Sequence, residues 1–336
     1  MSATVHPIAA AAEPSLEPIV ALTATAMNAV NAVILERMQS KVAMIPELAG
    51  HLIAGGGKRM RPMLTLASAA LLDYPGTRHH KLAAAVEFIH TATLLHDDVV
   101  DGSAMRRGKR AANLIWGNPA SVLVGDFLFS RAFELMVEDG SLKVLKILSH
   151  ASAVIAEGEV DQLSAQRQIE TSEDQYLGII NAKTAELFAA ACRIAPVVAE
   201  AGEAAEEALE CFGRNLGIAF QLVDDAIDYS SDSATMGKGR GDDLRDGKVT
   251  LPVILAFARG SAEERAFWAR AIAGDADQAT LAEATCLIRT SGALDDTMER
   301  ARLYARRAID SLAPFPAGRA KSALIEAAGF AVARRY

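Results

Sequence analysis

Apolar residues recur at spacings of three and four along most of this chain, which is the period of amphipathic helices. Alternating apolar and polar runs, which would indicate half-buried strands, are not evident. The pattern therefore predicts an all-α fold. The predicted helices span residues 16–44, 64–72, 82–101, 121–137, 142–167, 172–198 and 203–229, and further helices begin near Thr250 and continue toward the C-terminus.

Breaks in this pattern mark the expected tail, a loop and the start of a helix. Residues 1–15 are rich in alanine and contain two prolines, so we expect a loose N-terminal tail. Residues 230–246 are rich in Ser, Gly and Asp and predict a flexible loop. Thr250 is a candidate N-cap, because Pro252 follows it in the first helical turn. No linker divides two cores, so residues 16–336 are predicted to form one large domain.

Composition and charge narrow the class of protein. Hydrophobic residues make up 51% of the chain and aromatic residues only 5%, which favours closely packed, alanine-rich helices. The net charge of −8 argues against a nucleic-acid partner. The first basic residue is Arg37, so the preceding residues fit neither a secretory signal nor a transit peptide. No uninterrupted apolar run reaches the about 18 residues of a transmembrane span. We expect a protein that is not transmembrane, although it could still touch a membrane surface.

The three cysteines, Cys192, Cys211 and Cys286, are scattered, and no two have zinc-ligand spacing. An odd, scattered set does not indicate a disulfide framework, so a reducing cytoplasm is the expected location. We expect all three to be small buried hydrophobic residues.

Two aspartate clusters of the same form are the most informative feature of the chain. They read DDVVD at 97–101 and DDAID at 224–228, each within apolar helical sequence. Residues four apart share a helix face, so the first and last aspartates of each cluster point the same way. Three carboxylates on one buried turn need a cation to offset their repulsion and desolvation. Two such turns facing each other would hold hard divalent ions, which would in turn hold a polyanion such as diphosphate. A solvent-facing acidic stripe is the alternative, and the large apolar residues before and within the first cluster count against it.

Two further polar residues share faces with the clusters. On a helical projection, His90 lies within about 20° of the line through Asp97 and Asp101. Gln221 shares a face with Asp224. A hydrogen-bonding residue of the core is the alternative for Gln221. Asp242, Asp243 and Asp246, in the loop that follows the second cluster, could reach a metal or could form a solvated turn.

Basic residues gather beside acidic or glycine-rich breaks in the helices. The segment GGGKRMRP at 55–62 places flexible backbone N–H groups beside three cations, which suits a diphosphate. It is not a P-loop, because the GxxxxGK[ST] pattern is missing. Any one of these cations could be ordinary solvated surface. The candidates are Lys58, Arg59, Arg61, Arg106, Arg107, Lys183 with its neighbour Thr184, Lys238 and Lys248.

Together these segments resemble the trans-isoprenyl diphosphate synthases, or polyprenyl synthetase family, and are most similar to the long-chain members that build quinone side chains. The resemblance implies an isoprenoid synthase fold of antiparallel helices around a deep central cavity, usually in a homodimer. It also implies repeated condensation of isopentenyl diphosphate onto an allylic diphosphate with trans geometry. The motifs that carry it are GGGKRMRP at 55–62, EFIHTATLLHDDVVD at 87–101, MRRG at 105–108, GDFLFSRAFELM at 125–136, KTAELF at 183–188, FQLVDDAID at 220–228 and GDDLRDGKVTLP at 241–252.

The resemblance implies roles for matching positions. Asp97, Asp101 and Asp224 would bind Mg²⁺, with Asp98 and Asp228 in support. The first three, with Lys183, are the expected catalytic residues. Isopentenyl diphosphate would be held by Lys58, Arg61, His90 and Arg107. The allylic diphosphate would be held by Arg106, Lys183, Thr184, Gln221, Lys238 and Lys248.

The length of the product is expected from two positions one helical turn before the first cluster. Ala92 and Thr93 are not aromatic, whereas Phe or Tyr at these positions marks short-chain members of the family. The resemblance therefore implies a long product of about C40–C50. Phe129 and Phe133, four residues apart, are candidates for the floor of the cavity, with simple core packing as the alternative.

Several other functions remain to be weighed. A shorter-chain geranylgeranyl or farnesyl diphosphate synthase differs only in the depth of the cavity. A non-catalytic regulatory subunit usually loses one aspartate cluster, whereas both are present here. A terpene cyclase would not need a second diphosphate site at Lys58, Arg61 and His90. A calcium-binding structural protein is excluded, because the clusters lack the loop spacing of an EF-hand.

Overall fold

The computed structural model describes residues 14–54, 57–106, 108–230, 241–274 and 276–334. Arg107, Lys238 and nearly all of the predicted N-terminal tail lie outside the described residues. The elements of the first half are α1 (Glu17–Arg37), α2 (Met44–Ala54), α3 (Met60–Leu71), α4 (Arg78–Val100), β1 (Met105–Arg106), β2 (Lys109–Arg110), α5 (Ala112–Trp116), α6 (Asn118–Asp139) and α7 (Leu142–Ala165). Those of the second half are α8 (Glu173–Ile180), the π-helical turn η1 (Asn181–Ala185), α9 (Glu186–Val198), α10 (Glu203–Ser230), α11 (Asp242–Arg245), α12 (Leu251–Arg259), α13 (Ala262–Ala273), α14 (Gln278–Thr290), α15 (Ala293–Ser311) and α16 (Arg319–Ala333).

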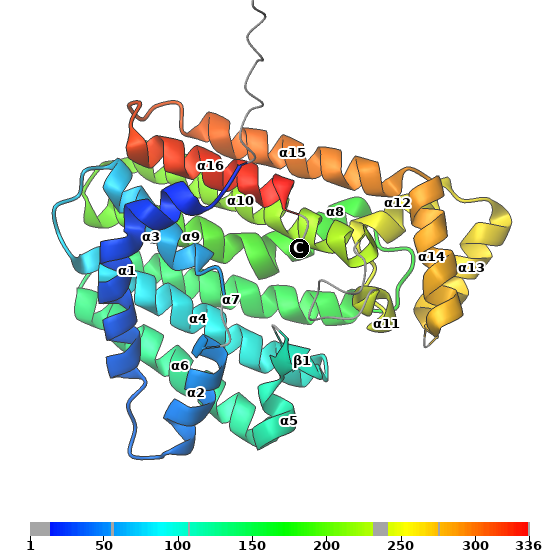
Figure 1. The fold of residues 1–336 in the computed structure, drawn as a ribbon, viewed down its shortest axis with the longest axis horizontal. Helices are drawn as coiled ribbons and strands as arrows, with labels where there is room; N and C mark the ends of the chain where they lie inside the picture. Colours follow the sequence, from blue (N-terminus) through cyan, green and yellow to red (C-terminus); the bar gives the residue numbers. More distant parts are fainter. Residues whose placement is uncertain (1–13, 55–56, 107, 231–240, 275, 335–336) are drawn as a thin grey trace, which may run out of the picture.

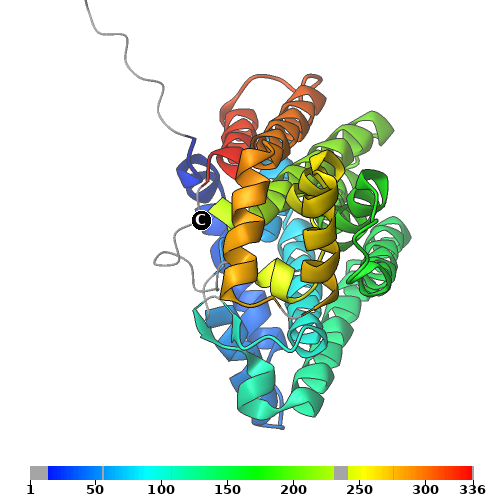
Figure 2. The same ribbon diagram turned by 90° about the vertical axis from the view of Figure 1, so that its right-hand side faces the viewer.

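Long helices surround the site. Helices α4, α7, α9 and α10 run along the long axis of the molecule, with α15 and α16 above α10 (Figure 1). Contacts join α4 to α6, α9 to α7 and α3, and α10 to α9 and α15. The end-on view shows α13 and α14 crossing one end of this assembly (Figure 2). The long helices thus lie side by side over most of the length of the molecule.

Three groups of buried apolar side chains hold the helices together. One joins α4, α6, α7 and α9, a second joins α10 to α12–α15, and a third joins α3, α9, α10 and α16. Alanines fill many of these positions and let helix axes approach closely. Larger anchors such as Phe88, Phe212 and Trp268 are almost fully buried, each worth about 1.5–3 kcal/mol of apolar burial.

The predicted all-α fold is confirmed, with local corrections. The predicted helix over 16–44 is wrong in length: α1 ends at Arg37 and α2 begins at Met44, because the polar segment between them favours a turn. The predicted continuous helix 172–198 contains the π turn η1. A two-residue antiparallel hairpin, β1 with β2, was not predicted. Thr250 occupies the predicted N-cap position, but its side chain makes no capping hydrogen bond.

The structure also tests the predicted burial of the cysteines and the predicted absence of a transmembrane segment. Cys192 is buried as expected, whereas Cys211 and Cys286 are exposed, so that part of the prediction is wrong. By length and composition alone α1 could span a membrane, with a hydropathy of 1.7. One face of α1, including Ile19 and Ile34, is buried, and the helix packs against α3, α4 and α16.

Candidate active site

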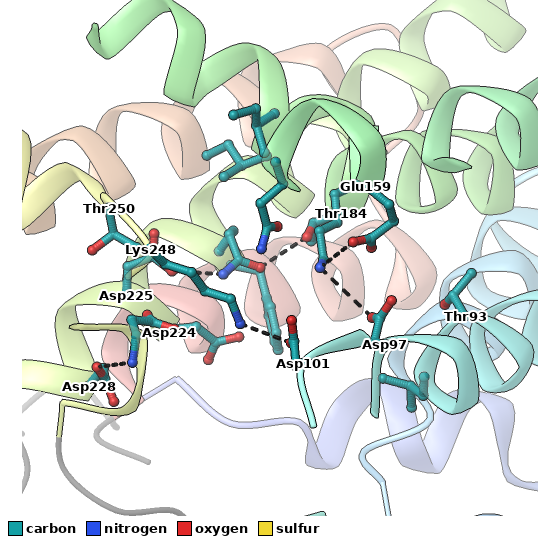
Figure 3. Close-up of a pocket in the computed structure, with 18 of the residues that line it drawn as sticks. Thr93, Asp97, Asp101, Glu159, Thr184, Asp224, Asp225, Asp228, Lys248 and Thr250 are labelled. Carbon is teal, nitrogen blue, oxygen red and sulfur yellow. Dashed lines mark hydrogen bonds and ion pairs between the residues drawn. The ribbon is translucent and has the colours of Figure 1, made fainter. Parts of the chain in front are cut away.

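One cavity of about 760 Å³ brings both aspartate clusters together. Its walls come from α3, α4, α7, α10 and the π turn η1. Figure 3 shows Asp97 and Asp101 on one side and Asp224, Asp225 and Asp228 on the other. The predicted site residues that line it are Lys58, Arg61, His90, Thr93, Asp97, Asp101, Arg106, Lys183, Thr184, Gln221, Asp224, Asp228 and Lys248. Arg107 and Lys238 lie outside the described residues.

The first cluster lies at the C-terminal end of α4. Asp97 and Asp101 share the face that lines the cavity. Burial raises the pKa of Asp97 to about 7, although the nearby Lys183 ammonium acts in the opposite direction. Asp98 points elsewhere: its side chain is fully buried and accepts a hydrogen bond of 2.8 Å from Nε of Arg106. Asp98 therefore holds Arg106 against the end of α4.

The second cluster lies near the C-terminal end of α10. Asp224 forms an ion pair with Arg334 of the C-terminal segment. Asp225 is buried and accepts hydrogen bonds from the Tyr176 hydroxyl and the Gln221 amide. Burial and the neighbouring Asp243 raise the pKa of Asp225 to about 8. All three aspartates of the cluster line the cavity, and the middle one is also fixed by its hydrogen bonds to Tyr176 and Gln221.

Asp228 completes the second cluster. Its Oδ2 accepts a hydrogen bond of 3.3 Å from the backbone N–H of Asp243. Burial, with the charge of Asp243, raises the pKa of Asp228 to about 8. Of the three loop aspartates that could have formed a solvated turn, Asp242 and Asp243 line the cavity and Asp246 does not.

Two lysines lie between the clusters. Nζ of Lys248 is 2.9 Å from Oδ2 of Asp101 (Figure 3) and 3.0 Å from Oδ2 of Asp246. Nζ of Lys183 is 2.7 Å from Glu159 and 3.9 Å from Asp97. Although burial opposes it, the surrounding carboxylates raise the pKa of Lys248, so this ammonium stays charged. These cations offset part of the carboxylate charge.

A second basic group lines the cavity at the start of α3. Nη1 of Arg61 lies 3.2 Å from Nε2 of His90, and its guanidinium lies 4.4 Å from the centroid of Phe188. Nζ of Lys58 lies 5.0 Å from the centroid of the Phe330 ring. Burial, and then the charge of Arg334, lowers the pKa of Lys58. The charges of Lys58 and Arg61 suit this part of the cavity wall to an anion.

A chain of polar side chains connects the π turn to α10. The Thr184 hydroxyl donates to Oε1 of Gln221 at 2.9 Å, and the Gln221 amide donates to Oδ1 of Asp225 at 2.8 Å. Because each partner fixes the next, the dipoles of Thr184 and Gln221 have one defined orientation at the cavity wall.

Three residues of the site were missed by the sequence analysis. Glu159 pairs with Lys183, Tyr176 bonds to Asp225, and Arg334 pairs with Asp224. Glu159 lies in a helix with other charges and carries no distinguishing pattern. Arg334 lies 110 residues from its partner, so only the tertiary fold reveals it.

The predicted determinants of product length are separated by the structure. Thr93 lines the cavity, whereas Ala92 is fully buried in the core and does not line it. Phe129 packs partly buried against the first core group. Phe133 is 41% exposed on α6, so its predicted role as the floor of this cavity is wrong. The pattern of four-residue spacing identified a helix face but not the direction of that face.

The donor chemistry of the site fits a hard divalent cation. Its carboxylate oxygens suit Mg²⁺ or Ca²⁺, and the raised pKa values of Asp97 and Asp228 reflect negative charge held out of water. Among the residues that the structure describes, no three His, Cys, Asp or Glu side chains already converge as a metal site. Lys248 and Arg334 are drawn to two of these carboxylates instead.

The chain is similar to known proteins over nearly its whole length. Residues 42–288 match the sequence profile of the family described as polyprenyl synthetase. The chain is 45% identical over 320 residues to octaprenyl diphosphate synthase of Escherichia coli (strain K12), covering 95% of this chain and 99% of that protein.

Two solved structures have the same fold. A polyprenyl synthase from Caulobacter crescentus CB15, complexed with calcium and isoprenyl diphosphate, gives a TM-score of 0.94 at 55% identity and covers 97% of this chain and 100% of its own. A decaprenyl diphosphate synthase from Rhodobacter capsulatus gives a TM-score of 0.91 at 49% identity, covering 95% of this chain and 98% of its own. The expected isoprenoid synthase fold is confirmed, and the chain belongs to the polyprenyl synthetase family of prenyltransferases.

Proposed function

We propose that this chain is a Mg²⁺-dependent trans-polyprenyl diphosphate synthase. It extends an allylic diphosphate with successive isopentenyl diphosphate units to a long product of about C40–C50, which supplies quinone side chains. The observation that carries the proposal is that both aspartate clusters and a separate basic group line one cavity. Relatives named octaprenyl and decaprenyl diphosphate synthases support the long product.

The carboxylates are assigned to the metal. Asp97 and Asp101 from α4 and Asp224 from α10 would hold Mg²⁺, with Asp98 and Asp228 in support. Bound there, the metal supplies electrostatic stabilisation of the departing diphosphate. The related polyprenyl synthase from Caulobacter crescentus CB15, which was solved in complex with calcium and isoprenyl diphosphate, supports a divalent ion. Binding requires Lys248 and Arg334 to leave the carboxylate oxygens that they contact.

The two substrates are assigned to separate groups of residues. Lys58, Arg61 and His90, with Arg107, hold isopentenyl diphosphate. Contact of the Arg61 guanidinium with Nε2 of His90 supports a preformed anion site. The residues assigned to the allylic diphosphate are Arg106, Lys183, Thr184, Gln221, Lys238 and Lys248.

The reaction follows from this distribution of charge. The C–O bond of the allylic diphosphate breaks, and Lys183 and Lys248 stabilise the negative charge that develops on the leaving group. The double bond of isopentenyl diphosphate then attacks the allylic cation and forms the new C–C bond. We assign stabilisation of that cation to the dipoles of the Lys183 carbonyl, the Thr184 hydroxyl and the Gln221 amide. The hydrogen bond between Thr184 and Gln221 fixes the last two relative to each other. The released diphosphate accepts the proton, so no side-chain base is needed.

The alternatives account for less of the site. A non-catalytic subunit is disfavoured, because both aspartate clusters are intact and line the cavity. A cyclase is disfavoured by the second basic group, for which it has no use. A geranylgeranyl or farnesyl diphosphate synthase remains the nearest alternative, and Thr93, a small residue at the cavity wall, favours the longer product.

A homodimer is part of the proposal. Large apolar side chains are exposed on the neighbouring helices α6 and α7, and such patches mark protein contacts. These residues, which we call the α6–α7 apolar residues, are Leu123, Phe133, Val137, Leu142, Val160 and Leu163. The proposed location is the cytoplasm, with transient membrane contact for release of the product.

The proposal is tested by turnover of the purified chain. Farnesyl diphosphate, labelled isopentenyl diphosphate and Mg²⁺ are incubated with the protein, and the dephosphorylated products are sized. We expect long products that disappear when EDTA replaces Mg²⁺. Absence of turnover in the chain alone would instead support a regulatory subunit, and products that stop at C15 or C20 would support a short-chain synthase.

A further inference from the structure

The π turn η1 is an unusual element at the cavity wall. It interrupts an otherwise α-helical run between α8 and α9, and the backbone N–H of Glu186 bonds to the carbonyl of Asn181, five residues back. This turn carries Lys183 and Thr184, which both line the cavity. π turns are rare within α-helices and persist only where the surroundings favour them. We therefore expect contacts with the neighbouring helices to stabilise this π turn.

Helix α7 presses on the turn from one side through Gly158. A Cβ atom at this position would lie 2.7 Å from Cβ of Ala182 and 3.1 Å from the backbone N of Lys183. Real Cβ atoms essentially never approach within 3.0 Å of another heavy atom, so any larger residue would displace the turn. Glycine at 158 is thus required by the closeness of the two backbones.

Helix α10 presses on the turn and on the start of α9 from the other side. A Cβ atom at Gly217 would lie 2.6 Å from Cα of Ala185, and one at Gly213 would lie 2.3 Å from the carbonyl oxygen of Phe188. These two glycines are four residues apart, so they form one strip on α10. The strip lets α10 approach closely enough for Thr184 to reach Gln221, one turn beyond Gly217.

Arg214 joins the two ends of the turn. Its Nη1 donates to Oδ1 of Asn181 at 3.0 Å and to Oε2 of Glu186 at 2.7 Å. Its Nη2 donates to Oε1 of Glu210 at 3.0 Å on its own helix. One planar guanidinium thus connects the residue that begins η1 with the residue that follows it, which a flexible ammonium could not do as rigidly.

We propose that Gly158, Gly217 and Arg214 are positioning residues that clamp η1, so that Lys183 and Thr184 are directed at the allylic diphosphate. This inference rests on the proposed function for the identity of the ligand. None of the three lines the cavity, so each acts through the residues of η1. The clamp is expected to control affinity for the allylic substrate and to leave the isopentenyl diphosphate site on α3 and α4 unaffected.

The sharpest test is a single added methyl group. Gly158→Ala introduces the clash with Ala182, whereas Gly178→Ala, on α8 just before the turn, meets nothing within 4 Å and is the matched control. We expect Gly158→Ala to raise KM for farnesyl diphosphate about tenfold or more, since small misplacements of binding groups are costly. Its KM for isopentenyl diphosphate and both constants of Gly178→Ala should stay within about twofold of the original.

A compensating double variant and a variant of Arg214 distinguish a loss of positioning from general damage to the fold. Ala182→Gly removes the methyl group that Gly158→Ala strikes. The contact of 3.1 Å with the backbone N of Lys183 remains, so the double variant should recover part of the affinity for farnesyl diphosphate. Arg214→Lys keeps the charge but loses the fork, and it should raise the same KM. An effect that is equal for both substrates, or no effect of Gly158→Ala, would overturn the clamp, as would a double variant no better than the single one.

Hydrogen exchange provides a readout that does not depend on activity. Amides of residues 181–186 should exchange faster in Gly158→Ala than in Gly178→Ala, because the clamp no longer holds the turn. Equal exchange in the two variants would overturn the clamp whatever the kinetics show. If the unmodified chain has no synthase activity, but hydrogen exchange in the two variants differs as expected, the proposed function fails while the clamp stands.

Discussion

Nζ of Lys248 lies 2.9 Å from Oδ2 of Asp101, although 147 residues separate them in the sequence. The lysine follows the second aspartate cluster, and the aspartate ends the first. Their ion pair therefore connects the first cluster to the segment that follows the second one (Figure 3). The raised pKa of Lys248, maintained by Asp243, Asp101 and Asp246 against the effect of burial, keeps it positively charged where diphosphate is proposed to leave.

Removing this charge tests its part in catalysis. Lys248→Met should lower kcat/KM for the allylic substrate by about 10²-fold or more, as expected for the loss of one preorganised charge at a leaving group. Lys41→Met, at an exposed lysine outside the cavity, is the control and should change nothing. Steady-state kinetics with each substrate varied in turn gives the answer. A Lys248→Met enzyme of ordinary activity would remove the residue from the proposed site.

Affinity for Mg²⁺ should depend on pH. The pKa of Asp97 is raised to about 7 and that of Asp228 to about 8, chiefly by burial, so both carboxyls bind protons in the metal-free protein near neutrality. A metal needs the deprotonated form, so protons compete with it and its binding releases them. We expect the Mg²⁺ dissociation constant to rise about tenfold or more between pH 8 and pH 6, measured by calorimetry without substrate. An affinity constant across this range would contradict the assignment of these carboxylates.

Product length should respond to Thr93, which lines the cavity one turn before Asp97. Thr93→Phe is expected to shorten the product, because the ring would block the growing chain. Thr93→Val keeps the shape and should leave the length unchanged. Ala92 is fully buried and does not line the cavity, so Ala92→Phe should mainly destabilise the fold, by about 1–3 kcal/mol, through overpacking. Chromatography of the dephosphorylated products decides; an unchanged distribution in Thr93→Phe would show that the chain grows past another wall.

The α6–α7 apolar residues should determine the oligomeric state. Phe133 and Val137 are 41% and 64% exposed and lie four residues apart on α6. Replacing both with Glu should convert a dimer into a monomer in analytical ultracentrifugation, since two charges cannot be buried unpaired in an interface. Val20→Glu, on an exposed position of α1, is the control and should remain dimeric. A double variant that sediments like the original would move the interface elsewhere.

The sequence predicted the parts of the site that depend on local helix geometry. The two aspartate clusters lie on strongly periodic helices, so the face shared by Asp97 and Asp101 followed from helix geometry alone. Distant partners were not visible: Arg334 reaches Asp224 only through the packing of α16. The partner of Asp98, a residue predicted to support the metal, was not visible either: from a fully buried position it accepts a hydrogen bond from Arg106. Helix periodicity gives the face of a helix but not what lies opposite.

The π turn shows a different limit. Residues 181–185 carry no propensity that distinguishes a π turn from an α-helix, so the sequence predicted one continuous helix. The signal lies in other helices, at Gly158, Gly213 and Gly217, where a side chain has no room. Glycine within a helix lowers its helix propensity, and only the tertiary structure shows why glycine is needed at these positions.

The most direct test of the account is a crystal structure with Mg²⁺ and an unreactive thio analogue of farnesyl diphosphate. We expect Mg²⁺ ions to be bound by Asp97 and Asp101 on one side and by Asp224 on the other, all coordinating the same diphosphate, with Lys248 in contact with it. A diphosphate bound away from both clusters, or metal at one cluster only, would contradict the claim that the two aspartate helices form a single site.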